Sequence, residues 1–75
     1  MAKLTKIIEF CTSNMEEIKE EVYNRELQFD EKSDSYQESE KGQEYEYKTE
    51  ALDDLIELLF EVQEKAQNIK DGNFY

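Results

Sequence analysis

The stretch Glu50–Ile69, EALDDLIELLFEVQEKAQNI, decides the fold. At about 100° of rotation per residue, its apolar side chains cover an arc of roughly 200°, about twice that of an ordinary surface helix. Aspartate and glutamate side chains fill the remaining arc, with few basic residues among them. The stretch therefore predicts a helix whose apolar face is too wide to be covered by a single neighbouring helix.

A second helical pattern precedes this stretch. Apolar residues recur at alternating intervals of four and three, and Arg25 fills the one gap in the series Leu4, Ile8, Cys11, Met15, Ile18, Val22 and Phe29. This spacing predicts a helix over about residues 3–29 that packs lengthwise on another helix. The polar segment Thr12-Ser13-Asn14 allows a kink or a fresh start capped by Asn14, but one helix is the simpler prediction.

The segment between the two patterns predicts a turn. Residues 30–35, DEKSDS, are polar, rich in turn-forming residues and long enough to join antiparallel helices. Ser35 and Glu38 have the spacing of a capping box at the start of the next helix. Ser33 offers a competing cap, from which the helix would begin slightly earlier.

The second helix is predicted to run over about residues 36–70. Gly42 is its weak point, since glycine inside a helix costs up to about 1 kcal/mol relative to alanine. A break near Gly42 is therefore an alternative. Lys70 in the last turn and Gly72 just beyond it predict the end of the helix, followed by a short tail.

These patterns predict an all-α fold, a single domain over residues 1–75 built as an antiparallel two-helix hairpin. A monomer of this size buries a marginal core, and the wide apolar arc of the second helix needs further cover. We therefore expect a homodimer that forms a four-helix bundle. The residues expected at this interface are Leu52, Leu55, Leu58, Leu59, Phe60, Val62 and Ile69.

Composition argues against several functional classes. The formal net charge is −11, from 20 acidic and 9 basic residues, which argues against direct binding to nucleic acids or to anionic membranes. No run of about 18 apolar residues is present to span a membrane. The amino-terminal residues lack the continuous apolar core of a signal peptide, and a lone thiol suits a reducing compartment, so we expect a cytoplasmic protein.

The sequence contains few residues of the types that serve catalysis or bind cofactors. The sequence has no histidine, no glycine-rich phosphate loop and one cysteine, Cys11, which lies on the apolar seam and is expected to be a core residue. A carboxylate-bridged metal centre would require inward-facing Glu-x-x-His pairs. We therefore expect no enzyme activity, no cofactor and no metal.

The acidic side of the second helix is the main candidate for a binding site. Its carboxylates follow one another at intervals of three or four residues and form an acidic ridge of Glu46, Glu50, Asp53, Glu57, Glu61 and Glu64. Helical rise places successive charges about 5–6 Å apart, comparable to the charge spacing along a nucleic-acid strand. The ridge thus predicts contact with a basic protein surface, such as the groove of a nucleic-acid-binding host protein. The alternative is a solvated face that keeps an apolar assembly soluble.

The segment after the turn carries a short motif, formed by Tyr36, Gln37, Glu38, Ser39 and Gly42. An aromatic-Gln-Glu-Ser-x-x-Gly run that follows an acidic turn resembles a motif of small helical-hairpin proteins of phages and bacteria, although tyrosine stands here where tryptophan is expected. The resemblance covers a tenth of the chain or less. It implies a helical hairpin and a phage or mobile-element setting, and it supplies no activity. The alternative interpretation is a helix cap followed by close packing of helices.

Together these features predict a non-enzymatic acidic binding protein. A phage-encoded inhibitor or modulator of a host protein, of the anti-defence (anti-CRISPR) or nucleic-acid-mimic type, fits the description. The alternative is a structural or adaptor hairpin that acts through oligomerisation. Binding that weakens steeply with salt would indicate the first, because an apolar contact is not screened.

Overall fold

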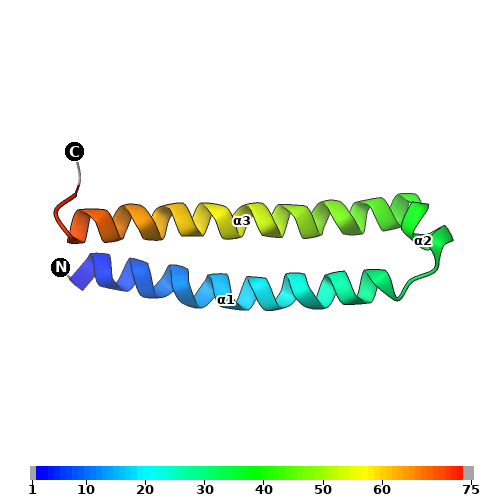
Figure 1. Ribbon diagram of the computed structural model, residues 1–75, viewed down its shortest axis with the longest axis horizontal. Helices are drawn as coiled ribbons and strands as arrows, with labels where there is room; N and C mark the ends of the chain where they lie inside the picture. Colours follow the sequence, from blue (N-terminus) through cyan, green and yellow to red (C-terminus); the bar gives the residue numbers. More distant parts are fainter. Residues whose placement is uncertain (1, 74–75) are drawn as a thin grey trace.

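The computed structural model describes residues 2–73, which form the three helices α1 (Ala2–Asp30), α2 (Asp34–Glu38) and α3 (Glu40–Lys70). The long helices α1 and α3 run antiparallel side by side, and the short helix α2 lies at the end where they are joined (Figure 1). The hairpin measures 53 × 21 × 13 Å along its principal axes. The predicted all-α antiparallel hairpin is confirmed.

The apolar seam predicted on α1 faces α3. Cys11, Met15 and Val22 are buried, and the other members of the series are half-buried. The helix continues through the polar segment, where Asn14 Nδ2 donates a hydrogen bond to the Phe10 carbonyl (2.8 Å) instead of capping a new helix. The prediction of one continuous helix is therefore confirmed.

The stripe on α3 that packs against α1 also alternates between intervals of three and four residues. It consists of Gly42, Tyr45, Thr49, Leu52, Ile56, Leu59, Gln63 and Ala66, all buried or half-buried. Two of the hydrogen bonds that cross the interface lie well apart along α3: Arg25 Nε donates to Thr49 Oγ1 (2.9 Å), and Gln63 Nε2 donates to Thr12 Oγ1 (2.9 Å). Since each contact satisfies polar groups only at one alignment, the two together specify the register of the hairpin.

The junction between α2 and α3 corrects the predicted second helix. The chain leaves the helical conformation at Ser39 (φ −74°, ψ 164°), so no single helix runs from residue 36 to residue 70. Ser33, and not Ser35, caps α2 by accepting a hydrogen bond from the Tyr36 amide (3.3 Å). Ser39 caps α3 by accepting from the Gly42 amide (3.1 Å). The alternative prediction of a break near Gly42 was the right one.

Gly42 is required by space, because the last turn of α2 lies directly on the first turn of α3. A Cβ atom at this position would collide with the carbonyl oxygen of Tyr36 and lie 2.9 Å from that of Gln37. The Ser39 hydroxyl also donates to the Tyr36 carbonyl, which ties the two helices together at their corner. The motif of residues 36–42 thus forms a cap followed by close helix packing, as the alternative interpretation predicted.

The end of α3 confirms the predicted stop signal. Gly72 has a φ of 87°, a conformation that glycine adopts without a steric cost. Its amide donates to the Ile69 carbonyl (3.1 Å), and the Asn73 amide donates to the Asn68 carbonyl (2.7 Å). This pair of hydrogen bonds is a Schellman motif.

The hydrophobic core is small. Within residues 2–73 the buried apolar side chains are Cys11, Met15, Val22 and Ala66. Many large apolar side chains remain exposed, namely Ile7, Phe10, Tyr23, Leu27, Tyr47, Leu55, Leu58, Phe60, Val62 and Ile69. Two helices have only one mutual interface, so apolar residues elsewhere on their surfaces stay in contact with water.

Candidate functional site

All six carboxylates of the acidic ridge are exposed on α3. Those of Glu46, Glu50 and Asp53 line a hollow near the junction with α2, which we call the apex hollow. The other three members, Glu57, Glu61 and Glu64, line a second hollow along the hairpin, the central hollow. Within the described part of the chain none of the six carboxylate groups makes a hydrogen bond or an ion pair.

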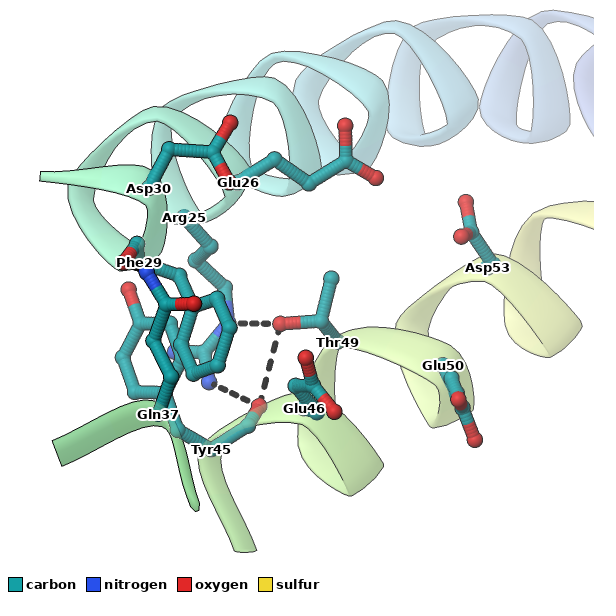
Figure 2. A pocket seen from close by; sticks show the side chains of 10 residues that line it. All are labelled: Arg25, Glu26, Phe29, Asp30, Gln37, Tyr45, Glu46, Thr49, Glu50 and Asp53. Atoms are coloured by element: carbon teal, nitrogen blue, oxygen red, sulfur yellow. Dashed lines mark hydrogen bonds between the residues drawn. The ribbon is translucent and has the colours of Figure 1, made fainter. Parts of the chain in front are cut away.

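The apex hollow has a volume of about 420 Å³ and is lined by both long helices and α2 (Figure 2). In addition to the three ridge residues, α1 contributes the carboxylates of Glu26 and Asp30. These two acids were not among the residues predicted from sequence. They belong to a different helix, and only the antiparallel register brings them opposite Glu46 and Asp53.

Arg25 lies within the apex hollow, where its own contacts hold it. Its Nη2 donates to the Tyr45 carbonyl (3.0 Å), in addition to the bond from Nε to Thr49. The guanidinium carbon lies 3.9 Å from the centroid of the Tyr45 ring, a cation–π geometry, and that ring stacks on Phe29 (6.0 Å between centroids, 12° between planes). These contacts explain how a charged residue occupies a seam position.

Residues of the short motif support this arrangement from the side of α2. Gln37 Nε2 donates to the carbonyls of Phe29 (3.1 Å) and Lys32 (3.2 Å) and thereby holds α2 against the end of α1. The Tyr36 ring lies 6.4 Å from that of Phe29. These contacts give Tyr36 and Gln37 a role in the architecture of the hairpin.

The central hollow combines an apolar floor with charged walls. Met15, Ile56 and Phe60 supply the apolar surface, and the hollow has a volume of about 460 Å³. Lys19 of α1 is the one basic residue that lines it, facing the three carboxylates of the ridge. The ridge is therefore bordered by apolar side chains along this part of α3.

The structure separates the residues predicted for an oligomer interface into three groups. Leu52 and Leu59 are half-buried in the stripe that packs against α1, and Phe60 lines the central hollow beside the ridge. The remaining four are exposed, and their helical spacing places them on the side of α3 away from most of the ridge. These four are Leu55, Leu58, Val62 and Ile69.

Apolar residues of α1 extend this group of four. Ile7 lines a third hollow together with Val62 and Ile69, and Leu4 and Ala66 complete its apolar wall, while Glu61 and Lys65 border it. This terminal hollow has a volume of about 340 Å³. Phe10 lies one helical turn from Ile7 and so shares its side of α1. We call Ile7, Phe10, Leu55, Leu58, Val62 and Ile69 the apolar flank.

The described residues contain no group of three or more histidine, cysteine, aspartate or glutamate side chains placed to hold a metal ion. Cys11 is 1% exposed, in agreement with its predicted place in the core. None of the helices in residues 2–73 is long and apolar enough to cross a membrane.

Comparison with known proteins gives no relative. No protein-family model, no curated protein and no solved structure matches the chain. The resemblance of the motif at residues 36–42 to hairpin proteins of phages and bacteria therefore stays a prediction.

Proposed function

We propose that the protein acts without catalysis, as an acidic binding protein whose ridge contacts a basic surface on a partner protein. One observation carries this proposal: the six ridge carboxylates are exposed along one helix and have no partner within the described hairpin. Unpaired like charges at helical spacing cost stability, and a basic partner would offset that cost. A groove shaped for nucleic acid offers such a surface, because its basic side chains have the spacing of phosphates.

The proposal includes self-association as a homodimeric four-helix bundle. The exposed side chains of the apolar flank support it, since water contact is unfavourable for each of them. In such a bundle the ridge of each copy stays on the outside. An inhibitor of a nucleic-acid-binding host protein, phage-encoded and of the anti-CRISPR or nucleic-acid-mimic type, fits this arrangement in the cytoplasm.

The test is displacement of DNA. A small, basic, histone-like DNA-binding protein is loaded with fluorescent duplex DNA, and the release of DNA by the hairpin is followed by anisotropy at low and moderate salt. The wild type is expected to displace the DNA, and less so as salt rises. The ridge variant carries Glu50→Gln, Asp53→Asn and Glu57→Gln and is expected to compete at least about tenfold more weakly, from the loss of three charge contacts.

A matched control removes the same number of charges from α1. Glu17, Glu20 and Glu21 are exposed glutamates outside the ridge, and the variant with glutamine at all three is expected to compete as the wild type does. If the hairpin displaces no DNA, or if both triple variants weaken equally, the acidic ridge is not the binding surface.

The second candidate function is that of a structural or adaptor hairpin that acts through its apolar surface. The exposure of Leu58 (58%) and Phe60 (56%) favours it. An adaptor would bind its partner with little salt dependence, and the ridge variant would bind as well as the wild type.

A further inference from the structure

The hairpin exposes more surface than a compact protein of its mass. Its accessible surface is 5975 Å², whereas a compact monomer of 9.0 kDa exposes about 4,900 Å². Its radius of gyration is 16.7 Å, compared with about 11 Å for a compact domain of this length. The difference in surface, about 1,100 Å² per chain, is enough for one interface of standard size, which buries about 800 Å² on each partner.

The two sides of the hairpin differ in what they offer a second copy. The side of the acidic ridge would bring like charges together across a two-fold axis, which is unfavourable. The apolar flank offers side chains from both long helices, with Phe10 63% and Leu58 58% exposed, around the terminal hollow. A second copy therefore gains most by covering the apolar flank.

The positions of these residues along the hairpin select the arrangement. Leu55 and Leu58 lie near the middle of α3, and the other four residues of the apolar flank lie in the half away from α2. The contact between Thr12 and Gln63 sets Phe10 level with the segment between Val62 and Ile69. A two-fold axis parallel to the long helices places α1 of one copy beside α3 of the other at the same level. A reversed copy would instead set the apolar half of one hairpin against the α2-containing half of the other, which has fewer exposed apolar side chains.

We propose that a second copy of this chain covers the apolar flank, with the Phe10 ring of each copy seated in the terminal hollow of the other. The hollow, with Leu4, Ile7, Val62, Ala66 and Ile69 in its walls, offers an apolar surface at the level of the ring. Neighbouring helices then run antiparallel throughout the four-helix bundle, a favourable topology. This inference rests on the homodimer of the proposed function, and it gives that dimer two outward-facing acidic ridges.

The first test compares two aromatic residues of α1 that are equally exposed. Phe10 and Tyr23 are 63% and 61% exposed, so neither is needed to cover the core. Circular dichroism of each variant verifies that it keeps its helicity. Sedimentation velocity over a range of concentrations measures the dimer dissociation constant. Phe10→Asp is expected to raise it by a factor of about 30 or more, as for the loss of a central aromatic anchor. Tyr23→Asp is expected to leave it unchanged.

The second test examines the seat of the ring directly. Phe10→Lys and Val62→Asp are each expected to weaken the dimer, because each places a charge in the apolar contact. Mixed in equal amounts, the two variants are expected to form a heterodimer, which has one native contact and one in which lysine faces aspartate. Size-exclusion chromatography with light scattering detects it as a species of twice the 9.0 kDa mass.

The outcomes separate this inference from the homodimer itself. A wild-type chain that stays monomeric at all concentrations would refute the dimer of the proposed function and this inference with it. If the wild type is a dimer and Phe10→Asp leaves it intact, or if Tyr23→Asp weakens it as much as Phe10→Asp does, the homodimer stands and the proposed seat of Phe10 is refuted. Failure of the mixed variants to associate would refute the parallel two-fold arrangement.

Discussion

Replacement of Gly42 by alanine tests the tertiary structure against local helix propensity. Gly42 lies in the first turn of α3, and alanine is favoured over glycine inside a helix by about 1 kcal/mol. Most of this difference is conformational entropy, because alanine has fewer accessible conformations than glycine in the unfolded chain. From sequence alone, Gly42→Ala is thus expected to stabilise the protein.

The structure predicts the opposite sign. The added Cβ would collide with the Tyr36 carbonyl oxygen and lie 2.9 Å from the Gln37 oxygen, and both are backbone atoms that cannot move aside as a flexible side chain would. Displacing them also disturbs the hydrogen bond from the Ser39 amide to the Tyr36 carbonyl (3.0 Å) and the cap at Ser39. Overpacking costs about 1–3 kcal/mol and a lost cap about 1 kcal/mol. After the favourable propensity is subtracted, we expect a net loss of about 1–3 kcal/mol.

Urea unfolding followed by far-ultraviolet circular dichroism, at a single protein concentration, measures this change. Thermal unfolding gives a second reading, since each kcal/mol lowers the Tm by about 4–8 °C in a domain of this size. Gln43→Ala is the control, because Gln43 is the next residue of α3 and is exposed. It is expected to be neutral or slightly stabilising. If Gly42→Ala were stabilised to the same degree, the close contact between α2 and α3 would be wrong.

Two further substitutions examine the seam between α1 and α3. Arg25→Ala removes two hydrogen bonds and the stacking on Tyr45, and is expected to lower the free energy of unfolding by about 1–3 kcal/mol in urea titrations. Arg25→Lys should restore little of this, because lysine lacks the planar fork that bonds Thr49 and the carbonyl at once, and full rescue would contradict the geometry. Cys11→Ser places a hydroxyl at a 1% exposed position and is expected to lower the free energy of unfolding by about 1–3 kcal/mol. Cys11→Ala is expected to lower it less, by an amount at the low end of this range. In the wild type, Cys11 should react with a thiol reagent only as fast as the hairpin opens, and rapid reaction of the folded protein would show that it is not buried.

The sequence by itself determined the features that depend on local interactions. The alternation of four and three along α1 identified the buried side of that helix, including Cys11 and the unusual Arg25, because helical periodicity is set within a few turns of chain. The end of α3 at Gly72 followed from a residue that adopts positive φ without a steric cost. The exposed positions of the acidic ridge were likewise predicted from helical spacing alone.

Only the tertiary structure decided that α2 begins at the Ser33 cap and ends at Ser39. Ser33 and Ser35 are both acceptable caps in a sequence, and caps differ in free energy by too little to select one. The choice depends on the packing of α2 against Gly42 and against Phe29 at the end of α1. These contacts depend on how α2 is oriented against both long helices, which the capping pattern does not specify.

Tertiary structure also decided how the wide apolar arc of α3 is used. A helical wheel gives the angle of each side chain about one axis, but it does not say at which angle the neighbouring helix lies. The position of α1 buries a stripe that includes Thr49 and Gln63 and leaves Leu58 and Val62 exposed. In the same way the register sets Glu26 of α1 opposite the ridge, since a contact between distant residues depends on how two helices align and not on the period of either.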